Sequence, residues 1–152
     1  MIQVSWYGRG GQGAFTAARI LGAAYALGRV SEPAKYALAF PSFGPERRGA
    51  PVRAFTKLAE SPIHDRSEIK NADFIVFLDE TLYTGERDAL VAGPEDYACA
   101  EKFRLPTVNT VMLGRLAWKI GLSAEQIAEG IRRVMPERIR ERNVKAVREV
   151  MH

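Results

Sequence analysis

The chain has 152 residues, of which 47% are hydrophobic and 26% charged, and its formal net charge is +4. These values are typical of a soluble globular protein, and we expect a single domain over residues 1–152. No apolar run reaches membrane-spanning length and no basic leader precedes the first apolar segment, so we expect a cytoplasmic protein without membrane contact. One cysteine, Cys99, excludes an internal disulfide and a four-cysteine iron–sulfur cluster, and we predict no metal site.

The first half of the chain predicts strands and one long helix. Residues 2–7 alternate apolar and polar side chains, which indicates a β-strand. Residues 14–27 are apolar on nearly every face, which is typical of a helix packed on more than one side in a layered α/β domain. Further strands are predicted at 35–44, 51–58 and 73–79, and the last is an uninterrupted apolar run.

The middle of the chain has the weakest pattern. Residues 61–65 are a candidate partner for the strand at 51–58. Residues 84–102 predict only a short helix near 86–91 and a loop at Gly93–Pro94.

The final third predicts three helices. The first has apolar residues at helical spacing up to Gly121, and the second opens with a capping box formed by Ser123 and Gln126. A charged helix follows Pro136. We therefore predict an α/β fold, a three-layer α/β/α sandwich around a mostly parallel or mixed sheet, with a Rossmann-like strand, glycine loop and helix at its start.

The glycine loop between the first strand and helix is the strongest motif. Its residues are Gly8, Arg9, Gly10, Gly11, Gln12 and Gly13, and they satisfy G-x-G-x-x-G. Bare backbone amides, a helix N-terminus and the Arg9 guanidinium favour a phosphate or carboxylate. Two other interpretations are a glycine turn that only packs strand against helix, and an NAD(P) site. Glu32 is the only candidate ribose ligand, and no apolar strand precedes it.

A second constellation spans residues 40–52. Three prolines restrict this loop, which carries Phe43, Glu46, Arg47 and Arg48 in a defined geometry. A solvated or salt-bridged surface patch is the plainer interpretation of the paired arginines.

Two further features allow a structural and a functional interpretation. Asn109 and Thr110 come just before an apolar helix, where either could cap it. The last helix is rich in arginine, which raises the possibility of nucleic-acid binding. Its glutamates are interspersed with the arginines, which favours a solvated, salt-bridged face and no nucleic-acid partner.

Four segments taken together resemble one family. They are GRGGQGAFTAARIL (8–21), AFPSFGPERRGAPVRAFTKL (39–58), ADFIVFLDETL (72–82) and PTVNTVMLGRLAWKIGL (106–122). In this order they resemble the gamma subunit of the 2-oxoacid:ferredoxin oxidoreductases, of which the pyruvate and 2-ketoisovalerate enzymes are the best-known members. The resemblance covers residues 1–83 and 103–152.

This resemblance implies a non-catalytic subunit of a larger enzyme. Such a complex oxidatively decarboxylates a 2-oxoacid to an acyl-coenzyme A and passes the electrons to ferredoxin. Thiamine diphosphate and the iron–sulfur clusters would lie on partner subunits of the alpha, beta and delta types. The glycine loop, from Gly8 to Gly13, would face coenzyme A or another anion at the subunit interface. The interface or the same anion would be contacted by Phe43, Glu46, Arg47, Arg48, Asn109 and Thr110.

The sequence departs from the family pattern at one place. Members usually carry a further strand, helix and strand between the segments that here end at Leu82 and begin at Pro106. We expect residues 84–102 to be too short and too polar to hold that portion.

Overall fold

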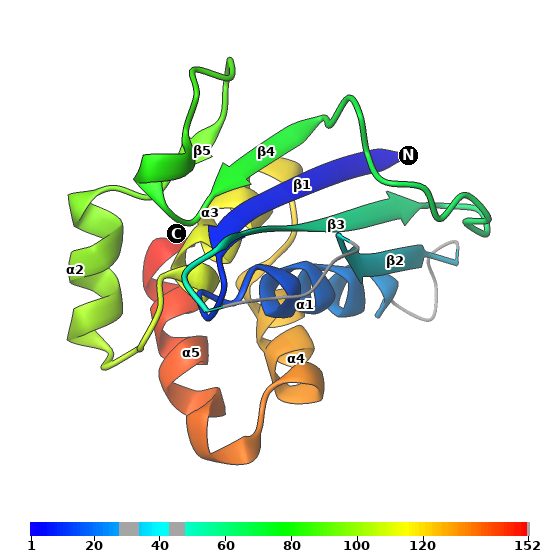
Figure 1. Ribbon diagram of the computed structural model, residues 1–152. Helices are drawn as coiled ribbons and strands as arrows, with labels where there is room; N and C mark the ends of the chain where they lie inside the picture. The colour runs from blue at the N-terminus through cyan, green and yellow to red at the C-terminus, as the bar shows by residue number, and fades with distance from the viewer. Residues whose placement is uncertain (28–33, 43–47, 152) are drawn as a thin grey trace.

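The computed structural model describes residues 1–27, 34–42 and 48–151 (Figure 1). Five strands, five α-helices and one short 3-10 helix form in this part of the chain. In chain order they are β1 (Ile2–Arg9), α1 (Ala14–Ala26), β2 (Tyr36–Pro41), β3 (Pro51–Ala59), β4 (Phe74–Phe77), η1 (Glu80–Leu82), β5 (Leu90–Val91), α2 (Pro94–Lys102), α3 (Asn109–Ile120), α4 (Ala124–Val134) and α5 (Glu137–Val150).

The strands form one mixed sheet with the order β2-β3-β1-β4-β5. Strand β1 is central, because it pairs antiparallel with β3 on one side and parallel with β4 on the other. Trp6 lies opposite Ala54 of β3 and Val76 of β4. The predicted α/β class, the mixed sheet and the initial strand, glycine loop and helix are confirmed.

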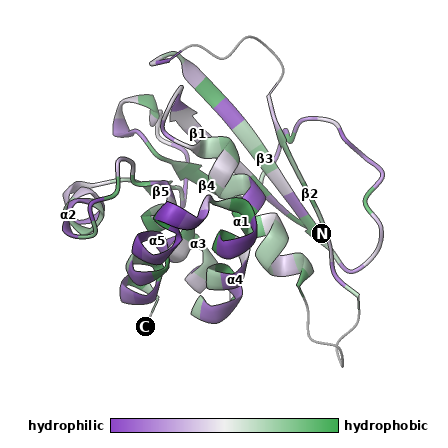
Figure 2. Ribbon diagram, turned by 90° about the horizontal axis from the view of Figure 1, so that it is seen from below, coloured by the Kyte–Doolittle hydropathy of each residue, from purple (hydrophilic) through white to green (hydrophobic). Residues whose placement is uncertain are grey.

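The helices are layered on one face of this sheet. Helix α1 packs on β2 and β3, α3 contacts β4, and α4 and α5 pack against α1 and α3 (Figure 1). In the described ranges the order of layers is therefore sheet, helix, helix, which differs from the expected helix layer on each face. Figure 2 shows hydrophilic residues interspersed along the outer helices α4 and α5.

Irregular segments cover the opposite face of the sheet. Phe55 and Lys57 point to this face and are buried. The Lys57 ammonium donates to the backbone oxygens of Asp65 at 2.9 Å and Ser67 at 2.8 Å, which holds the segment after β3 against the sheet. These contacts satisfy a buried cation and replace the strand predicted at 61–65, which does not form.

The segment 84–102 holds more structure than its sequence pattern predicts. The helix predicted near 86–91 is wrong, since Leu90 and Val91 form strand β5. Helix α2 then begins at Pro94, where the missing amide proton carries no penalty. The buried Asp96 carboxylate accepts from the Gly93 amide at 2.9 Å and from Arg115 of α3 at 2.7 Å. A polar buried anchor therefore fixes α2, and hydrophobic periodicity gives no sign of it.

The core lies between β1, β3 and β4 and the helices. Trp6 is fully buried and its indole N–H donates to the Thr56 hydroxyl at 3.0 Å, which itself donates to the Ala18 carbonyl at 3.0 Å. The capping box of Ser123 and Gln126 is confirmed at the start of α4. In the described ranges, no helix is long and apolar enough to cross a membrane.

Candidate functional site

The glycine loop joins β1 to α1 and needs left-handed backbone at two residues. Gly11 has φ 93° and Gly13 has φ 81°, a region that other residues rarely adopt. Gly13 also approaches α3 closely. A Cβ atom at Gly13 would lie 2.4 Å from Asn109 Nδ2, so the loop and the start of α3 can meet only because this residue is glycine.

The side chains of Arg9 and Gln12 hold the loop to Asp79, which follows the parallel strand β4. Gln12 Oε1 accepts from the Arg9 amide at 2.6 Å, and Gln12 Nε2 donates to Asp79 Oδ2 at 2.9 Å. Arg9 Nε lies 3.3 Å from the same carboxylate oxygen, and its Nη2 donates to the Thr81 hydroxyl at 2.9 Å. The Arg9 guanidinium is thus bonded within the protein, whereas the motif predicts a guanidinium that is free to bind an anion.

Asp79 is the acceptor at the centre of this network. The Thr81 hydroxyl and amide donate to its Oδ1, and Gln12 and Arg9 meet its Oδ2. The pKa of Asp79 lies below its ordinary value, chiefly because the Thr81 hydroxyl donates to the ionised form. A carboxylate in this setting stays ionised and structural at neutral pH.

The second sequence motif lies beside the first. Gly10 forms an isolated bridge with Arg48, its amide donates to the Ala50 carbonyl at 2.8 Å, and its carbonyl accepts from the Gly49 amide at 3.1 Å. The two motifs are therefore adjacent in space. Arg48 is exposed at this position. Phe43, Glu46 and Arg47 lie outside the described residues.

These contacts decide which loop amides can serve a ligand. The amides of Gly10 and Gln12 already donate to the backbone oxygens of Ala50 and Arg9. Within the described ranges, the amides of Gly11 and Gly13 form no such bond. The anion-binding capacity expected of the whole loop is therefore reduced to these two positions and the first turn of α1.

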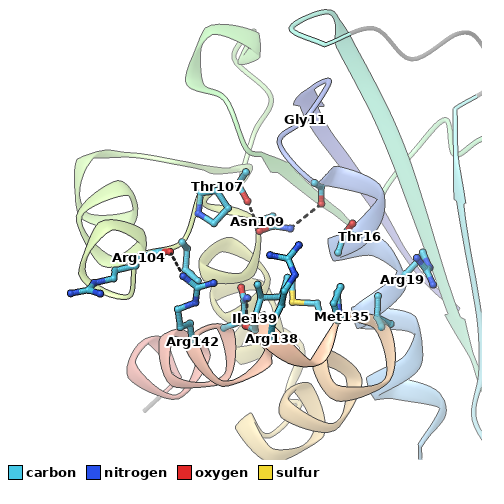
Figure 3. A pocket seen from close by; sticks show the side chains of 16 residues that line it. Gly11, Thr16, Arg19, Arg104, Thr107, Asn109, Met135, Arg138, Ile139 and Arg142 are labelled. Carbon is cyan, nitrogen blue, oxygen red and sulfur yellow. Dashed lines mark hydrogen bonds between the residues drawn. The ribbon is translucent and has the colours of Figure 1, made fainter.

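A cavity of about 710 Å³ opens beside Gly11 and Gly13 (Figure 3). It lies between the start of α1, the segment 104–107, the start of α3 and the first two turns of α5. Its basic lining residues are Arg19, Arg104, Arg138 and Arg142, and no described residue that lines it is acidic. The apolar part of its wall includes Leu105, Pro106, Met135 and Ile139. This combination suits a ligand with both an apolar part and an anionic group.

The arginines differ in where they point. Arg138 extends from α5 toward Asn109, between α5 and the glycine loop (Figure 3). In the described part of the chain its guanidinium forms no hydrogen bond or ion pair. Arg142 Nη1 donates to the Arg104 carbonyl at 3.3 Å. The side chains of Arg19 and Arg104 point away from the middle of the cavity, to the right and left of the view (Figure 3). Arg138 is thus the cation best placed for an anion in the cavity.

Asn109 and Thr110 do not cap α3 as the sequence suggests. They lie in its first turn, and Val108 is the N-cap residue, whose side chain makes no capping hydrogen bond. Asn109 Oδ1 accepts from the first-turn amide of Thr110 at 2.9 Å. Asn109 Nδ2 donates instead to the Gly13 carbonyl at 3.3 Å, and the Thr110 hydroxyl donates to Asn143 Oδ1 at 2.7 Å. Both residues are buried and connect the glycine loop to α5.

Three α5 residues of this site, Arg138, Arg142 and Asn143, were not found by sequence reasoning. Arg138 and Arg142 are one helical turn apart after Pro136, and their pattern with neighbouring glutamates is that of a solvated face. Asn143 is a polar residue on the buried side of α5, next to Val144 and Val147. A polar residue at a core position of a helix was the one available signal.

The topology is not that of a dinucleotide-binding unit. Such a unit needs a strand parallel to β1 directly after α1. Here α1 leads to β2, which pairs with β3, and the parallel neighbour of β1 is β4. Glu32, the candidate ribose ligand, lies outside the described residues. The order of the strands thus argues against the NAD(P) interpretation.

Cys99 offers no reactive or metal-binding centre. Burial raises the pKa of its thiol, and the nearby Glu149 carboxylate raises it further. Across the described ranges, no group of three or more histidine, cysteine, aspartate or glutamate residues could hold a metal ion.

Comparison with known proteins places the chain in a family. The model of the family described as pyruvate ferredoxin/flavodoxin oxidoreductase matches residues 3–95. The chain is 38% identical to pyruvate synthase subunit PorC of Methanothermobacter thermautotrophicus, with 97% of this chain and 93% of the relative covered. The chain belongs to the pyruvate ferredoxin/flavodoxin oxidoreductase family.

Other members of this family agree in sequence and in structure. The chain is 37% identical to the common gamma subunit of the pyruvate/ketoisovalerate oxidoreductases of Pyrococcus furiosus, over 98% of this chain and 95% of the relative. The crystal structure of pyruvate oxidoreductase subunit PORC from Thermotoga maritima superposes with a TM-score of 0.75 at 29% identity, covering 99% of this chain and 94% of that one. The resemblance stated from the sequence motifs is confirmed.

The comparisons also bear on the expected shortening. The alignment with the Methanothermobacter relative spans 172 positions against 152 residues here, so that relative has residues without a counterpart in this chain. Strand β5 and helix α2 form within 84–102, but among the described residues no second strand follows α2 before α3, so the segment holds only a part of the strand, helix and strand portion.

Proposed function

We propose that this chain works as the gamma subunit of a 2-oxoacid:ferredoxin oxidoreductase, the complex that converts a 2-oxoacid such as pyruvate to an acyl-coenzyme A and reduces ferredoxin. The observation that carries the proposal is similarity over nearly the whole chain to subunits named pyruvate synthase subunit PorC and common subunit gamma. The subunit acts with others, which we take to be of the alpha, beta and delta types.

The residues of this chain support a division of labour within the complex. A cluster of iron and sulfur needs about four cysteine ligands, and the single thiol of Cys99 is partly buried and has a raised pKa. We therefore assign thiamine diphosphate and the clusters to the partner subunits. We also propose that residues 1–152 form one domain, which is supported by a core cluster that runs from Val4 to Met151. We further propose that the complex is cytoplasmic.

We assign to this chain a part in binding coenzyme A. When bound, the coenzyme supplies the thiol that accepts the acyl group. Its phosphates are anionic, and the cavity beside the glycine loop fits such groups because its charged wall is formed by arginines. Gly11 and Gly13 have no side chains to fill the cavity, and within the described ranges their amides are free to donate to an anion. Arg138 extends from α5 toward the glycine loop. These residues would bind and orient the anion.

Arg9 and Gln12 have a different part in this account. Both are bonded to Asp79, so they hold the glycine loop in the shape that presents Gly11 and Gly13. The neighbouring loop, with Phe43, Glu46, Arg47 and Arg48, is proposed to contact a partner subunit or the same anion. Arg48 supports this, because it is exposed and bridges to the glycine loop.

The coenzyme part of the proposal is tested in the assembled enzyme. We expect Arg138→Ala to raise the KM for coenzyme A roughly tenfold with an unchanged kcat, since one charge-assisted contact is lost. Arg66→Ala is the matched control, because it removes the same charge from an exposed site outside the cavity. Equal KM values in the two variants would remove Arg138 from the coenzyme site.

A further inference from the structure

Four hydrogen bonds among five residues connect the glycine loop to α5. Asn109 Nδ2 donates to the Gly13 carbonyl at 3.3 Å, and Asn109 Oδ1 accepts from the Thr110 amide at 2.9 Å. The Thr110 hydroxyl donates to Asn143 Oδ1 at 2.7 Å, and Asn143 Nδ2 donates to the Ile139 carbonyl at 2.8 Å. Four of the five residues, Gly13, Asn109, Ile139 and Asn143, line the cavity, and Thr110 connects Asn109 to Asn143.

This polar chain is buried. Asn109 is 5% exposed, Thr110 0% and Asn143 4%. Among the described residues, no buried side-chain nitrogen or oxygen lacks a partner. Fully satisfied buried networks give a single arrangement, because any displacement leaves a polar group unpaired at a cost of about 1–3 kcal/mol.

Stability alone does not explain Asn143. It lies inside α5 beside the buried apolar residues Val144 and Val147. An asparagine is a weak helix former, and its amide can compete with the helix by bonding the carbonyl four residues before, as it does here with Ile139. An apolar side chain would pack the same surface without this cost. Buried polar residues of this kind are best known for fixing the register between two helices.

The register of α5 decides where the cavity arginines lie. Arg142 adjoins Asn143 in the sequence, and Arg138 lies just over one turn before it. At the other end of α5, contact with α3 is close and apolar, because a Cβ at Gly114 would lie 3.2 Å from Val150 Cγ2. That apolar contact limits the distance between the helices. The bond between Thr110 and Asn143 fixes the rotation of α5 at the cavity end.

We propose that Thr110 and Asn143 are positioning residues, which set the rotation of α5 so that Arg138 meets an anionic group held at Gly11 and Gly13. This inference rests on the proposed function, since the anion is taken to be a phosphate of coenzyme A. The two residues act through Arg138: Asn143 lines the cavity, but its side-chain amide is already bonded to the Thr110 hydroxyl and the Ile139 carbonyl.

The decisive variant is Thr110→Val combined with Asn143→Leu in the assembled enzyme. Replacing both partners of a buried hydrogen bond with apolar groups of similar size is nearly neutral for stability. A purely structural role therefore predicts a normal melting temperature and a normal KM for coenzyme A. The positioning role predicts a normal kcat and a KM for coenzyme A raised by roughly three- to tenfold.

Two single variants complete the test. Thr110→Ser keeps the hydroxyl and should keep the KM within about twofold of the parent. Thr56→Val removes an equally buried hydroxyl from β3, away from the cavity, and should lower the melting temperature without changing the KM. An unchanged KM in the double variant, while Arg138→Ala raises it, would overturn the positioning role and leave the coenzyme site intact. Unchanged values in both would overturn the coenzyme site and the positioning role together.

Discussion

Gln12 Nε2 donates to Asp79 Oδ2 at 2.9 Å, and this contact ties the loop after β1 to the loop after β4. The two strands are parallel neighbours, so their carboxyl ends meet at one edge of the sheet. Ligands of open α/β sheets bind outside this edge. In this chain the contact does not itself offer a ligand group. It fixes the shape of the glycine loop, and the two loop residues whose amides are unbonded in the described part of the chain, Gly11 and Gly13, line the cavity.

Neutralising Asp79 should loosen the glycine loop. In Asp79→Asn one side-chain oxygen becomes an amide donor, which opposes a donor from Thr81 or from Arg9 and Gln12. We expect the free energy of unfolding to fall by about 1–2 kcal/mol, measured by urea denaturation. Asp88→Asn is the control, because Asp88 is exposed in the segment before β5. An equal, small effect in both variants would contradict the role given to Asp79.

The same carboxylate predicts a pH dependence of stability. Its pKa is lowered in the folded chain, chiefly by the Thr81 hydroxyl, so the ionised form stabilises the fold. This contribution is complete above the pKa of about 3.9 of an unfolded aspartate and is lost as the pH falls through the lower folded value. Denaturation midpoints measured between about pH 6 and pH 2.5 should therefore fall less steeply in Asp79→Asn than in the parent chain. Equal pH dependence of the midpoints in the two chains would contradict a stabilising role of the ionised Asp79 carboxylate.

Gly13 should tolerate no side chain. Gly13→Ala places a methyl group 2.4 Å from Asn109 Nδ2 on a backbone with φ 81°. We expect a loss of about 2–4 kcal/mol in the free energy of unfolding. Gly85→Ala separates the two causes, because Gly85 has φ 95° and a Cβ atom there would meet no other atom within 4 Å. It should lose only about 1–2 kcal/mol. Equal losses would show that the approach to Asn109 is unimportant.

Helix α2 should depend on one buried carboxylate. Asp96→Ala removes the acceptor of the Gly93 amide and of the Arg115 guanidinium. We expect amide hydrogen exchange to rise across residues 94–102 while the exchange of β1 and β3 stays at the parent rate. Glu95→Ala, an exposed neighbour in the same first turn, is the control. Unchanged protection of α2 in Asp96→Ala would show that another contact anchors it.

Local patterns in the sequence predicted much of the fold. Residues 2–7 alternate as a strand, and the capping box at Ser123 marks the start of α4 as the structure has it. The placing of both helix layers on one face was not predictable, because no local pattern shows that an irregular segment, bonded to the Lys57 ammonium, covers the other face. Helix α2 was missed for a similar reason, since its anchor is the polar Asp96.

The candidate site was predicted in part. The glycine loop and Arg48 are adjacent, and Asn109 meets Gly13, all from segments that the sequence singled out. The ion pair between Arg9 and Asp79 was not predictable, because Arg9 ends β1, Asp79 follows β4, and no local pattern reveals that these two strands pair. Arg138 and Asn143 were missed because α5 reaches the cavity only through its packing on α3 and α4.

The most direct test of the account is the affinity purification of this chain, tagged at native expression in its own host, with the co-eluting proteins identified by mass spectrometry. We expect partner subunits with thiamine-binding and cysteine-rich ferredoxin-type sequences, and an eluate that reduces ferredoxin with a 2-oxoacid and coenzyme A. A chain recovered alone, with no such activity in the eluate, would contradict its assignment as a gamma subunit.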